Sequence, residues 1–305
     1  MTHYKTISDW LEDWQLPKPE HPLISVFKVD VTKMMHSSDS VTVFCDFYCI
    51  AIKRVTSAGD IKLKYGQQPY DFNEGIMHFT SPGQVTSLAV EKDVEVKQSG
   101  WYVVIHPDFL WNTPLASNIK RYEFWDYAVN ESLFLSEKEE EIVFGIIQNI
   151  HRETHTNIDK FSKQIIISQL ESLLNYAERF YNRQFVTREK VNHQILERLE
   201  KTLAGYLNSG QPAIKGLPTV NDIAALLHIS PKYLSNVLRM HTGQNTQQYI
   251  HEKLIEKAKE RISTSDLSMS EIAYELGFEH LQSFSRLFKA KTQLSPVEFR
   301  QLFKN

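Results

Sequence analysis

The sequence of 305 residues is poor in cysteine, with two residues, and has only eleven glycines and eleven prolines. Cys45 and Cys49 alone support neither a disulfide framework nor a four-ligand zinc site. The chain also lacks an apolar run of the roughly 18 residues that a membrane span requires. Met1–Trp14 has acidic residues and two tryptophans where a secretion signal has a basic start and an apolar stretch. We therefore expect a globular, cytoplasmic protein that does not bind membranes.

A large excess of charge of one sign is missing too, since 34 basic residues face 37 acidic ones, a formal net charge of −3. The balance is nevertheless uneven. Residues 193–305 carry 14 basic and 11 acidic residues, a net +3, which leaves 20 against 26, a net −6, for residues 1–192. A basic C-terminal part is a mild indication of a nucleic-acid partner. The length predicts two or three domains at roughly 100–200 residues each.

From Val41 to about Ile105 the sequence predicts β-strands. Val41–Ile52 is rich in β-branched and aromatic residues, and its even spacing places Cys45 and Cys49 on one face and Asp46 on the other. The two thiols are buried structural groups or, alternatively, a redox sensor. Short apolar segments follow at residues 61–65, 76–80, 84–90 and 101–105, with turns at 59–60, 73–75, 81–83 and 99–100. This pattern suggests an antiparallel sandwich or barrel.

The pattern changes to helical spacing after Phe134. Ser136 and Glu139 form a capping box before a helix with apolar residues at 142, 143, 146, 147 and 150. A second helix is expected over residues 159–181. Its apolar stripe packs on the barrel or faces a partner subunit. The stripe comprises Phe161, Ile165, Ile166, Leu170, Leu173, Leu174, Ala177 and Tyr181.

These patterns predict an N-terminal domain over residues 1–185, a polar linker over 186–192 and an all-helical domain over 193–305. The last of these contains an internal repeat, first at an offset of 49 residues and then at 50. Asp222-Ile-Ala224 and Leu227 recur as Glu271-Ile-Ala273 and Leu276, and Leu234, Leu238, Thr242 and Tyr249 recur as Phe284, Phe288, Thr292 and Phe299.

Each copy of the repeat predicts a helix, a tight turn and a second helix. The start signals of the helices are Thr219 with Asp222 and Ser230-Pro231 in the first copy, and Ser268 with Glu271 in the second. His228-Ile229 and Gly277-Phe278 supply the turns. The second helices pack through one apolar face, formed by Leu234, Val237 and Leu238 and by Phe284, Leu287 and Phe288.

The opposite faces of the second helices contain no acidic residue. Their short polar and cationic side chains are of the types that contact base edges and phosphates. We predict nine DNA-binding residues on these faces: Lys232, Ser235, Asn236, Arg239, Gln282, Ser283, Ser285, Arg286 and Lys289.

A long helix over residues 246–262 should connect the two copies. Its roughly 25 Å would hold them about one duplex turn apart. A final helix is expected from Ser295-Pro296, where Glu298 completes a capping box. The N-termini of both helices offer N–H groups to phosphates.

Residues 193–305 resemble the double helix-turn-helix DNA-binding domain of the AraC/XylS transcription regulators. The resemblance rests on Asp222-Ile-Ala224, Ser230-Pro-Lys-Tyr-Leu-Ser235, Thr242-Gly243, Glu271-Ile-Ala273, Leu276-Gly-Phe278, Phe284-Ser-Arg-Leu-Phe-Lys289 and Leu294-Ser-Pro296. It implies that base-reading positions fall on Lys232, Ser235, Asn236, Leu281, Gln282, Ser283, Ser285 and Arg286. Leu281 contacts a thymine methyl group or is buried. Gln293 departs from the family pattern, because many members have glycine there.

The N-terminal part resembles the cupin-like sensory and dimerisation domain of the same family. The resemblance implies an α+β chain: an antiparallel cupin-like β-barrel at about residues 20–115, a helix pair at about 136–181 and an all-α C-terminal domain with two helix-turn-helix units. It also implies a small-molecule effector in the barrel, a homodimer and RNA polymerase as a partner of an activator. Trp101–Leu110 and Ser136–Glu140 are similar to stretches in members from the Bacteroidetes, which indicates a bacterial source.

We expect no enzyme, no cofactor and no metal site. No His-x-His pair occurs, and His78 and His106 lie in or at the ends of expected strands. The sequence therefore predicts a sequence-specific, DNA-binding transcription regulator controlled by a small molecule. Two alternatives remain open: a cupin enzyme with a DNA-binding appendage, and a regulator whose N-terminal domain only dimerises.

Overall fold

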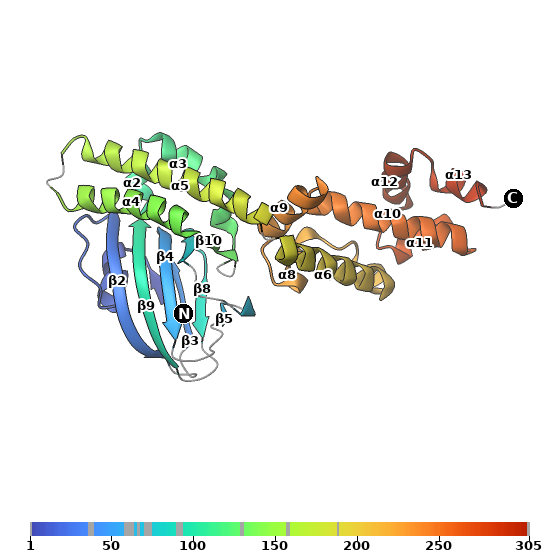
Figure 1. The fold of residues 1–305 in the computed structure, drawn as a ribbon. Coiled ribbons are helices and arrows are strands. Elements are labelled where there is room, and N and C mark those ends of the chain that lie inside the picture. The colour runs from blue at the N-terminus through green and yellow to red at the C-terminus, as the bar shows by residue number, and fades with distance from the viewer. Residues whose placement is uncertain are drawn as a thin grey trace. The chain divides into compact units, whose positions relative to one another are not determined.

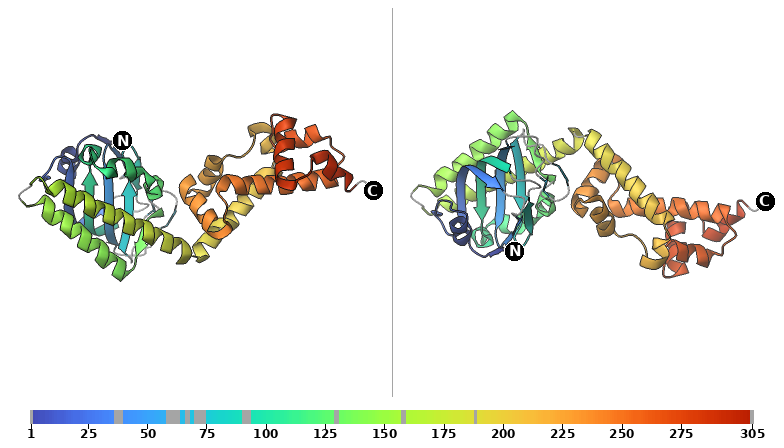
Figure 2. Two further views of the ribbon diagram at one scale, coloured as in Figure 1. Left: turned by 90° about the horizontal axis from the view of Figure 1, so that it is seen from above. Right: turned by 90° about the horizontal axis from the view of Figure 1, so that it is seen from below.

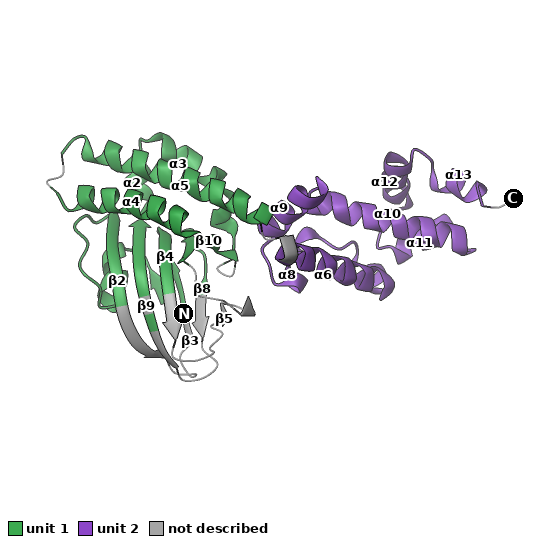
Figure 3. Cartoon of the chain, viewed as in Figure 1, with its two compact units in different colours: residues 1–187 green, residues 188–305 purple. Residues whose placement is uncertain are grey.

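The computed structural model describes residues 2–35, 40–57, 64–65, 68–69, 75–89, 94–128, 131–156, 159–187 and 189–303. The chain divides into two compact units, residues 1–187 and 188–305 (Figure 3). Unit 1 contains strands and helices, whereas the described part of unit 2 contains helices only. The predicted mixture of α and β structure with a helical C-terminal part is therefore confirmed.

Unit 1 contains two five-stranded sheets in its described part (Figure 1). Sheet A has the order β1 (Thr2–Tyr4), β3 (Ser40–Cys45), β8 (Thr86–Ala89), β5 (Lys64–Tyr65), β6 (Gln68–Pro69). Sheet B has the order β10 (Leu133–Leu135), β7 (Gly75–Thr80), β4 (Tyr48–Ser57), β9 (Val94–Ile105), β2 (Ile24–Met35). The described pairs are antiparallel apart from β1 and β3, which are parallel.

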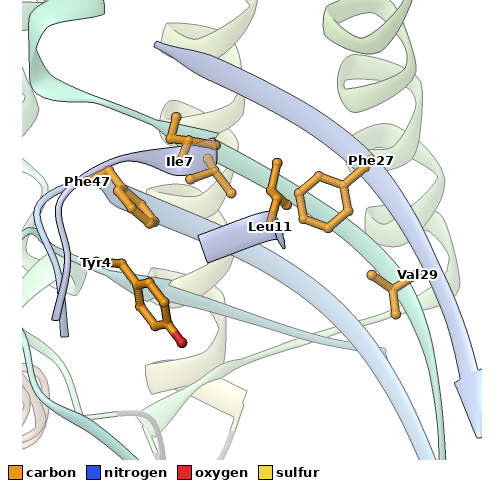
Figure 4. Packing of buried hydrophobic residues seen from close by; sticks show 7 residues of the cluster. Tyr4, Ile7, Leu11, Phe27, Val29 and Phe47 are labelled. Atoms are coloured by element: carbon orange, nitrogen blue, oxygen red, sulfur yellow. The ribbon is translucent and has the colours of Figure 1, made fainter. Parts of the chain in front are cut away.

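One face of sheet B packs against the short helix α1 (Ile7–Asp13). Its buried residues gather around that helix in Figure 4. The ring centroid of Trp10 lies 6.1 Å from that of Phe27, 5.9 Å from Phe47 and 6.2 Å from Tyr102. The cluster comprises Tyr4, Ile7, Leu11, Phe27, Val29, Phe47 and Val104. Aromatic side chains that are far apart in the sequence therefore fill this side of the sheet.

Helices α4 (Glu137–Thr154) and α5 (Ser162–Thr187) lie side by side against sheet B (Figure 2). The predicted capping box at Ser136 and Glu139 is confirmed. Arg183 of α5 donates from Nε to Glu139 Oε1 (3.0 Å) and from Nη2 to the carbonyl of Phe134 (2.7 Å), and so joins α5 to α4 and β10. Linking β9 to β10 are α2 (Pro107–Leu110), α3 (Pro114–Asn118) and the 3₁₀ turns η1 (Ile119–Arg121) and η2 (Glu123–Asp126).

Six of the eight residues of the apolar stripe predicted for α5 are buried. The other two, Phe161 and Ile165, are 55% and 44% exposed. Phe161 precedes the first residue of the helix, whereas Ile165 lies within its first turn. The helix also runs six residues past its predicted end, to Thr187 rather than 181.

The prediction of one strand over Val41–Ile52 is also wrong. β3 ends at Cys45 and β4 begins at Tyr48, in different sheets, so Cys45 and Cys49 do not share a strand. Asp46 lies in the link, where its amide donates to the carbonyl of Tyr4 (3.0 Å). This partner is distant in the sequence, and the two residues of the link, Asp46 and Phe47, are neither glycine nor proline. No local signal in the sequence therefore marks the break.

The turn predicted at residues 99–100 lies instead within β9. A Cβ atom at Gly100 would stand 1.9 Å from the carbonyl oxygen of Ile52, so the close approach of β4 requires glycine there. Of the expected strand 61–65 only Lys64–Tyr65 is described, in β5. The turns expected at 59–60 and 73–74 lie outside the described residues.

Unit 2 consists, where described, of eight helices: α6 (Glu189–Asn208), α7 (Gln211–Lys215), α8 (Val220–Leu227), α9 (Pro231–Thr242), α10 (Thr246–Thr264), α11 (Met269–Glu275), α12 (Leu281–Thr292) and α13 (Pro296–Gln301). α10 contacts α6, α9, α11, α12 and α13, and is therefore the central helix of the unit. Residues 186–192, predicted as a linker, belong to the end of α5 and the start of α6, apart from residue 188, which is not described. In the described ranges no helix is both long and apolar enough to cross a bilayer.

Candidate nucleic-acid interface

The first helix-turn-helix is formed by α8 and α9. Thr219 and Asp222 cap α8 reciprocally, and the hydrogen bonds to the Thr219 side chain and backbone lower the pKa of Asp222. The chain reverses at His228, whose φ is +57°, and the amide of Ile229 donates to the carbonyl of Ala224 (3.1 Å). Ser230 then accepts a hydrogen bond from the amide of Tyr233 (3.2 Å) and starts α9. The capping residues and the turn thus start α9 at the predicted position.

The second helix-turn-helix, α11 and α12, repeats this geometry. Ser268 and Glu271 form the capping box of α11, and hydrogen bonds to Ser268 lower the pKa of Glu271. The turn contains Gly277, with φ of +89°, and the amide of Phe278 donates to the carbonyl of Ala273 (2.9 Å). Both residues of this bond lie 49 positions after their counterparts, Ile229 and Ala224, so the structural repeat follows the sequence repeat.

The packed faces of α9 and α12 are the predicted ones. Leu234, Val237 and Leu238 are fully buried, and so are Phe284 and Phe288. Phe284 contacts Phe278 and Phe288, with ring centroids 5.3 and 5.8 Å apart. Leu287 is half-buried. This packing fixes the rotation of each helix, and therefore the side that faces solvent.

The nine residues predicted to bind DNA lie on the remaining sides of α9 and α12. Six are exposed: Lys232, Arg239, Gln282, Ser283, Arg286 and Lys289. Ser235, Asn236 and Ser285 are partly buried. Leu281 is 37% exposed. Neither helix contains an acidic residue, so the only charges that they carry are positive, histidine aside.

Eight of these nine residues, all except Ser283, form two equivalent sets. Lys232, Ser235, Asn236 and Arg239 each have a counterpart 50 positions later, namely Gln282, Ser285, Arg286 and Lys289. Within a set, the spacing i, i+3, i+4, i+7 places the side chains on one side of the helix. In the first set, Arg239 Nη1 donates to Asn236 Oδ1 (3.2 Å). The two helices therefore present equivalent positions, and their chemistry differs most at Lys232 and Gln282 and at Asn236 and Arg286.

The connecting helix α10 holds the two helix-turn-helix units. Its 19 residues correspond to a length of about 28 Å, somewhat more than predicted. Its start is capped by Asn245 and Gln248, whose amide side chains carry no charge, a capping box that the sequence reading missed. Because the first turn contains no acid, the positive end of the helix dipole is not neutralised there. At α13, by contrast, Glu298 places a carboxylate in the first turn.

Gly277 also allows the second turn to pack closely against the backbone of Pro212 and Gly216. The sequence pattern does not predict this contact. A Cβ atom there would lie 2.7 Å from the carbonyl carbon of Gly216 and 2.9 Å from the carbonyl oxygen of Pro212. Tyr206 donates its hydroxyl to the carbonyl of Gly216 (2.9 Å), and Arg198 donates to the carbonyl of Leu227 (2.9 Å). Residues of α6 thus support both helix-turn-helix units.

Unit 1 presents no metal centre among its described residues. His106 caps α2, since its Nδ1 accepts a hydrogen bond from the amide of Asp108 (3.3 Å). His78 is buried on the α1 side of sheet B, where burial and then the charge of Lys53 hold its pKa well below the usual value. Burial raises the pKa of both Cys45 and Cys49 to about 12. The two thiols are therefore protonated and poorly reactive near neutral pH.

Residues 223–302 match the family model described as a helix-turn-helix domain. The uncharacterized HTH-type transcriptional regulator YfiF of Bacillus subtilis is 29% identical over 148 residues, which cover 48% of this chain and 44% of that protein. The HTH-type transcriptional activator RhaS of Salmonella arizonae is 35% identical over 79 residues, which cover 26% of this chain and 28% of that protein.

Among solved structures, the C-terminal domain of the two-component response regulator yesN from Fusobacterium nucleatum is 29% identical, with a TM-score of 0.30; the match covers 36% of this chain and 98% of that one. The chain spans less than half the length of the curated relatives named above. The C-terminal unit contains an AraC-type helix-turn-helix domain, and its relatives in sequence are transcription regulators.

Proposed function

We propose that the protein is a transcription regulator that binds one asymmetric DNA site through α9 and α12, each in a segment of the major groove. The observation that carries the proposal is the pair of equivalent, acid-free polar faces on the two helices. A face that served solubility alone would usually alternate acidic and basic residues. The nine residues named above are the proposed contacts, with the start of α10 as a phosphate site.

The different chemistry of the two faces gives each helix its own preferred base. At equivalent positions α9 carries Asn236 and α12 carries Arg286. Asparagine pairs in bidentate fashion with adenine, whereas arginine pairs in that way with guanine. The proposed site therefore has an A·T pair under α9 and a G·C pair under α12, about one duplex turn apart.

Selection of fragmented genomic DNA by the purified protein, at physiological salt with nonspecific competitor, tests this function. We expect a recurring motif with two unlike halves. Arg286→Ala should relax the preference in the G·C half and Asn236→Ala that in the other half, each at a cost of about 1–3 kcal/mol. Binding that is salt-sensitive and shows no motif would contradict the proposal. A uniform loss over all sequences would make Arg286 a phosphate contact instead.

For unit 1 we propose a cupin-like barrel, formed by sheets A and B, that controls DNA binding in response to a small molecule. The proposed domain boundaries are residues 1–185, 186–192 and 193–305. The helix pair is the proposed dimer contact, and RNA polymerase is the proposed partner of an activator in the bacterial cytoplasm. Titration of candidate effectors into the selection assay tests the control: at least one should change the occupancy of the motif.

A regulator whose unit 1 only dimerises is the second candidate. It is favoured by one observation, the packing of Trp10, Phe27, Phe47 and Tyr102 between α1 and sheet B, which fills space that an effector would need. The loss of dimers on dilution, with no response to any effector, would support this candidate. The third candidate, a cupin enzyme with a DNA-binding appendage, requires a stoichiometric, tightly bound transition metal, which metal analysis of the purified protein would detect.

A further inference from the structure

Unit 1 contains a cavity of about 140 Å³ outside the aromatic cluster around Trp10. It lies where the start of β2, the helix α2 and the first turns of α5 meet. Ile24, Phe109 and Ile166 line it and are 1%, 5% and 4% exposed, so they form its apolar floor. A cavity of about 150 Å³ can hold a molecule the size of benzene. The floor can therefore accept the side chain of a small apolar ligand.

The cavity has charged groups of both signs at its rim. Asp159 and Lys163 are exposed, and the side chain of Asp108 is 38% exposed. The carboxylate of Asp159 is already engaged as the cap of α5, because its Oδ1 accepts from the amides of Phe161 (2.7 Å) and Ser162 (3.1 Å). Of the two rim carboxylates, that of Asp108 has no such capping role, and Lys163 supplies the ammonium group.

Asp108 and Lys163 are not paired with each other or with another charged side chain in the described part of the chain. His106 Nδ1 lies 3.6 Å from Asp108 Oδ1, and this nitrogen already accepts a hydrogen bond from the amide of Asp108 (3.3 Å). Lys163 Nζ donates to the carbonyl of Trp111 (2.9 Å) and lies 5.7 Å from the centroid of the Phe109 ring. An ammonium group has three donors, so two are left.

His21 adds a neutral donor to the cavity wall. Its Nδ1 accepts the amide of Leu23 (3.1 Å), so the neutral ring carries its proton on Nε2. Burial and then the charge of Lys163 lower the pKa of His21. Near neutral pH, the ring is thus a hydrogen-bond donor without a charge.

We propose that this cavity binds a free amino acid with an apolar side chain. The ammonium group of the ligand would face Asp108, its carboxylate would face Lys163 and the Nε2–H of His21, and its side chain would lie on Ile24, Phe109 and Ile166. A ligand with one charge would leave either Asp108 or Lys163 unpaired, whereas a zwitterion satisfies both. The apolar floor selects against amino acids with charged or strongly polar side chains.

The site lies at the start of the longest helix of unit 1. α5 has 26 residues, a length of about 39 Å, and ends at Thr187, the last residue of the unit. A ligand held between α2 and α5 therefore stabilises one position of α5 relative to the sheet. The proposal that an amino acid binds here does not depend on the DNA-binding function. That such a ligand regulates transcription rests on the proposed function.

Calorimetric titration of the full-length protein with the protein amino acids, one at a time, tests the proposal. At least one apolar amino acid should bind with a Kd below the millimolar range. Asp108→Asn and Lys163→Met should each weaken it by about ten-fold or more, as expected for the loss of a charge-assisted hydrogen bond. Lys160→Met is the matched control, because this exposed lysine of the same segment does not line the cavity. It should bind as the wild type does.

The matching amine and the matching carboxylic acid, each with the same side chain but one charge, should bind more weakly than the amino acid by about ten-fold. Equal binding of either one overturns the zwitterion assignment. The absence of binding by every amino acid, or binding that neither Asp108→Asn nor Lys163→Met changes while circular dichroism shows folded variants, overturns the site. DNA selection is measured separately, so a failure here is distinct from a failure of the proposed function.

Discussion

Gly243 and Gln293 end the helices α9 and α12 in the same left-handed conformation, with φ of +73° and +66°. The amide of each donates to the carbonyl four residues earlier, at Arg239 (3.0 Å) and Lys289 (2.9 Å). Glycine adopts this conformation without steric penalty, whereas a side chain makes it unfavourable. The second helix therefore ends in a strained residue, and the first does not.

Gln293→Gly should stabilise unit 2 by about 1 kcal/mol, because it removes this strain at an exposed position where no packing is lost. Chemical denaturation followed by far-ultraviolet circular dichroism measures the change. Tryptophan fluorescence reports the unfolding of unit 1, because all five tryptophans belong to residues 1–187, and this unfolding should not change.

The matched control is Gly243→Ala. A Cβ atom there would meet nothing within 4 Å, so only the backbone conformation is unfavourable, and we expect a loss of about 1 kcal/mol. Equal stability of Gln293→Gly and the wild type would contradict the prediction.

Gly277→Ala should destabilise unit 2 by more than the backbone conformation alone. The new Cβ would stand 2.7 Å from the carbonyl carbon of Gly216, and backbone cannot move aside as a flexible side chain does. We expect a loss of at least about 2 kcal/mol and weaker DNA binding. Gly210→Ala separates the two effects, because Gly210 has a similar φ of +72° and open space around it. A similar loss in both variants would exclude the steric contribution.

The sequence predicts the helix starts of unit 2 well because capping is local. Thr219, Ser268 and Ser295 each lie three residues before the acid that completes their capping box, and all three boxes are confirmed. The spacing of the buried residues within α9 and within α12 predicts which side of each helix faces solvent. Contacts with DNA at these positions stay a prediction.

Structural features that depend on residues distant in the sequence cannot be predicted from local sequence patterns. At the break between β3 and β4 the amide of Asp46 donates to the carbonyl of Tyr4, and the need for glycine at position 100 comes from the carbonyl oxygen of Ile52 in another strand. The cavity of unit 1 gathers residues of β2, α2 and α5 that are up to about 140 positions apart, such as Ile24 and Ile166. No periodicity within a single segment can show that these side chains meet.

The stability of unit 1 should fall as the pH drops below the pKa of an unfolded histidine, at about 6.5. Burial and Lys53 hold the pKa of His78 well below that value in the folded state. Between the two pKa values the unfolded chain binds a proton that the folded chain does not, so the free energy of unfolding decreases with falling pH, by up to about 1.4 kcal/mol per pH unit.

His78→Leu removes this contribution. Relative to the variant, the wild type should therefore lose stability between about pH 7 and pH 5. Urea denaturation followed by tryptophan fluorescence measures it, and exposed His155, changed to Gln, is the control. Parallel pH profiles of His78→Leu and the wild type would show that His78 is not responsible.

Lys289→Gln tests whether the positive side of α12 faces the DNA backbone. If Lys289 neutralises one phosphate, the slope of log Kobs against log salt concentration becomes shallower by about 0.9, with the sequence preference unchanged. Lys291→Gln is the matched control on the same helix. Lys291 lies near α10, where its charge, after burial, contributes to lowering the pKa of His251. Both variants remove one positive charge from the domain, so a general effect of net charge would change both slopes equally. A shallower slope for Lys289→Gln alone places the DNA on the side of α12 that also carries Gln282, Ser285 and Arg286, and equal slopes would place it elsewhere.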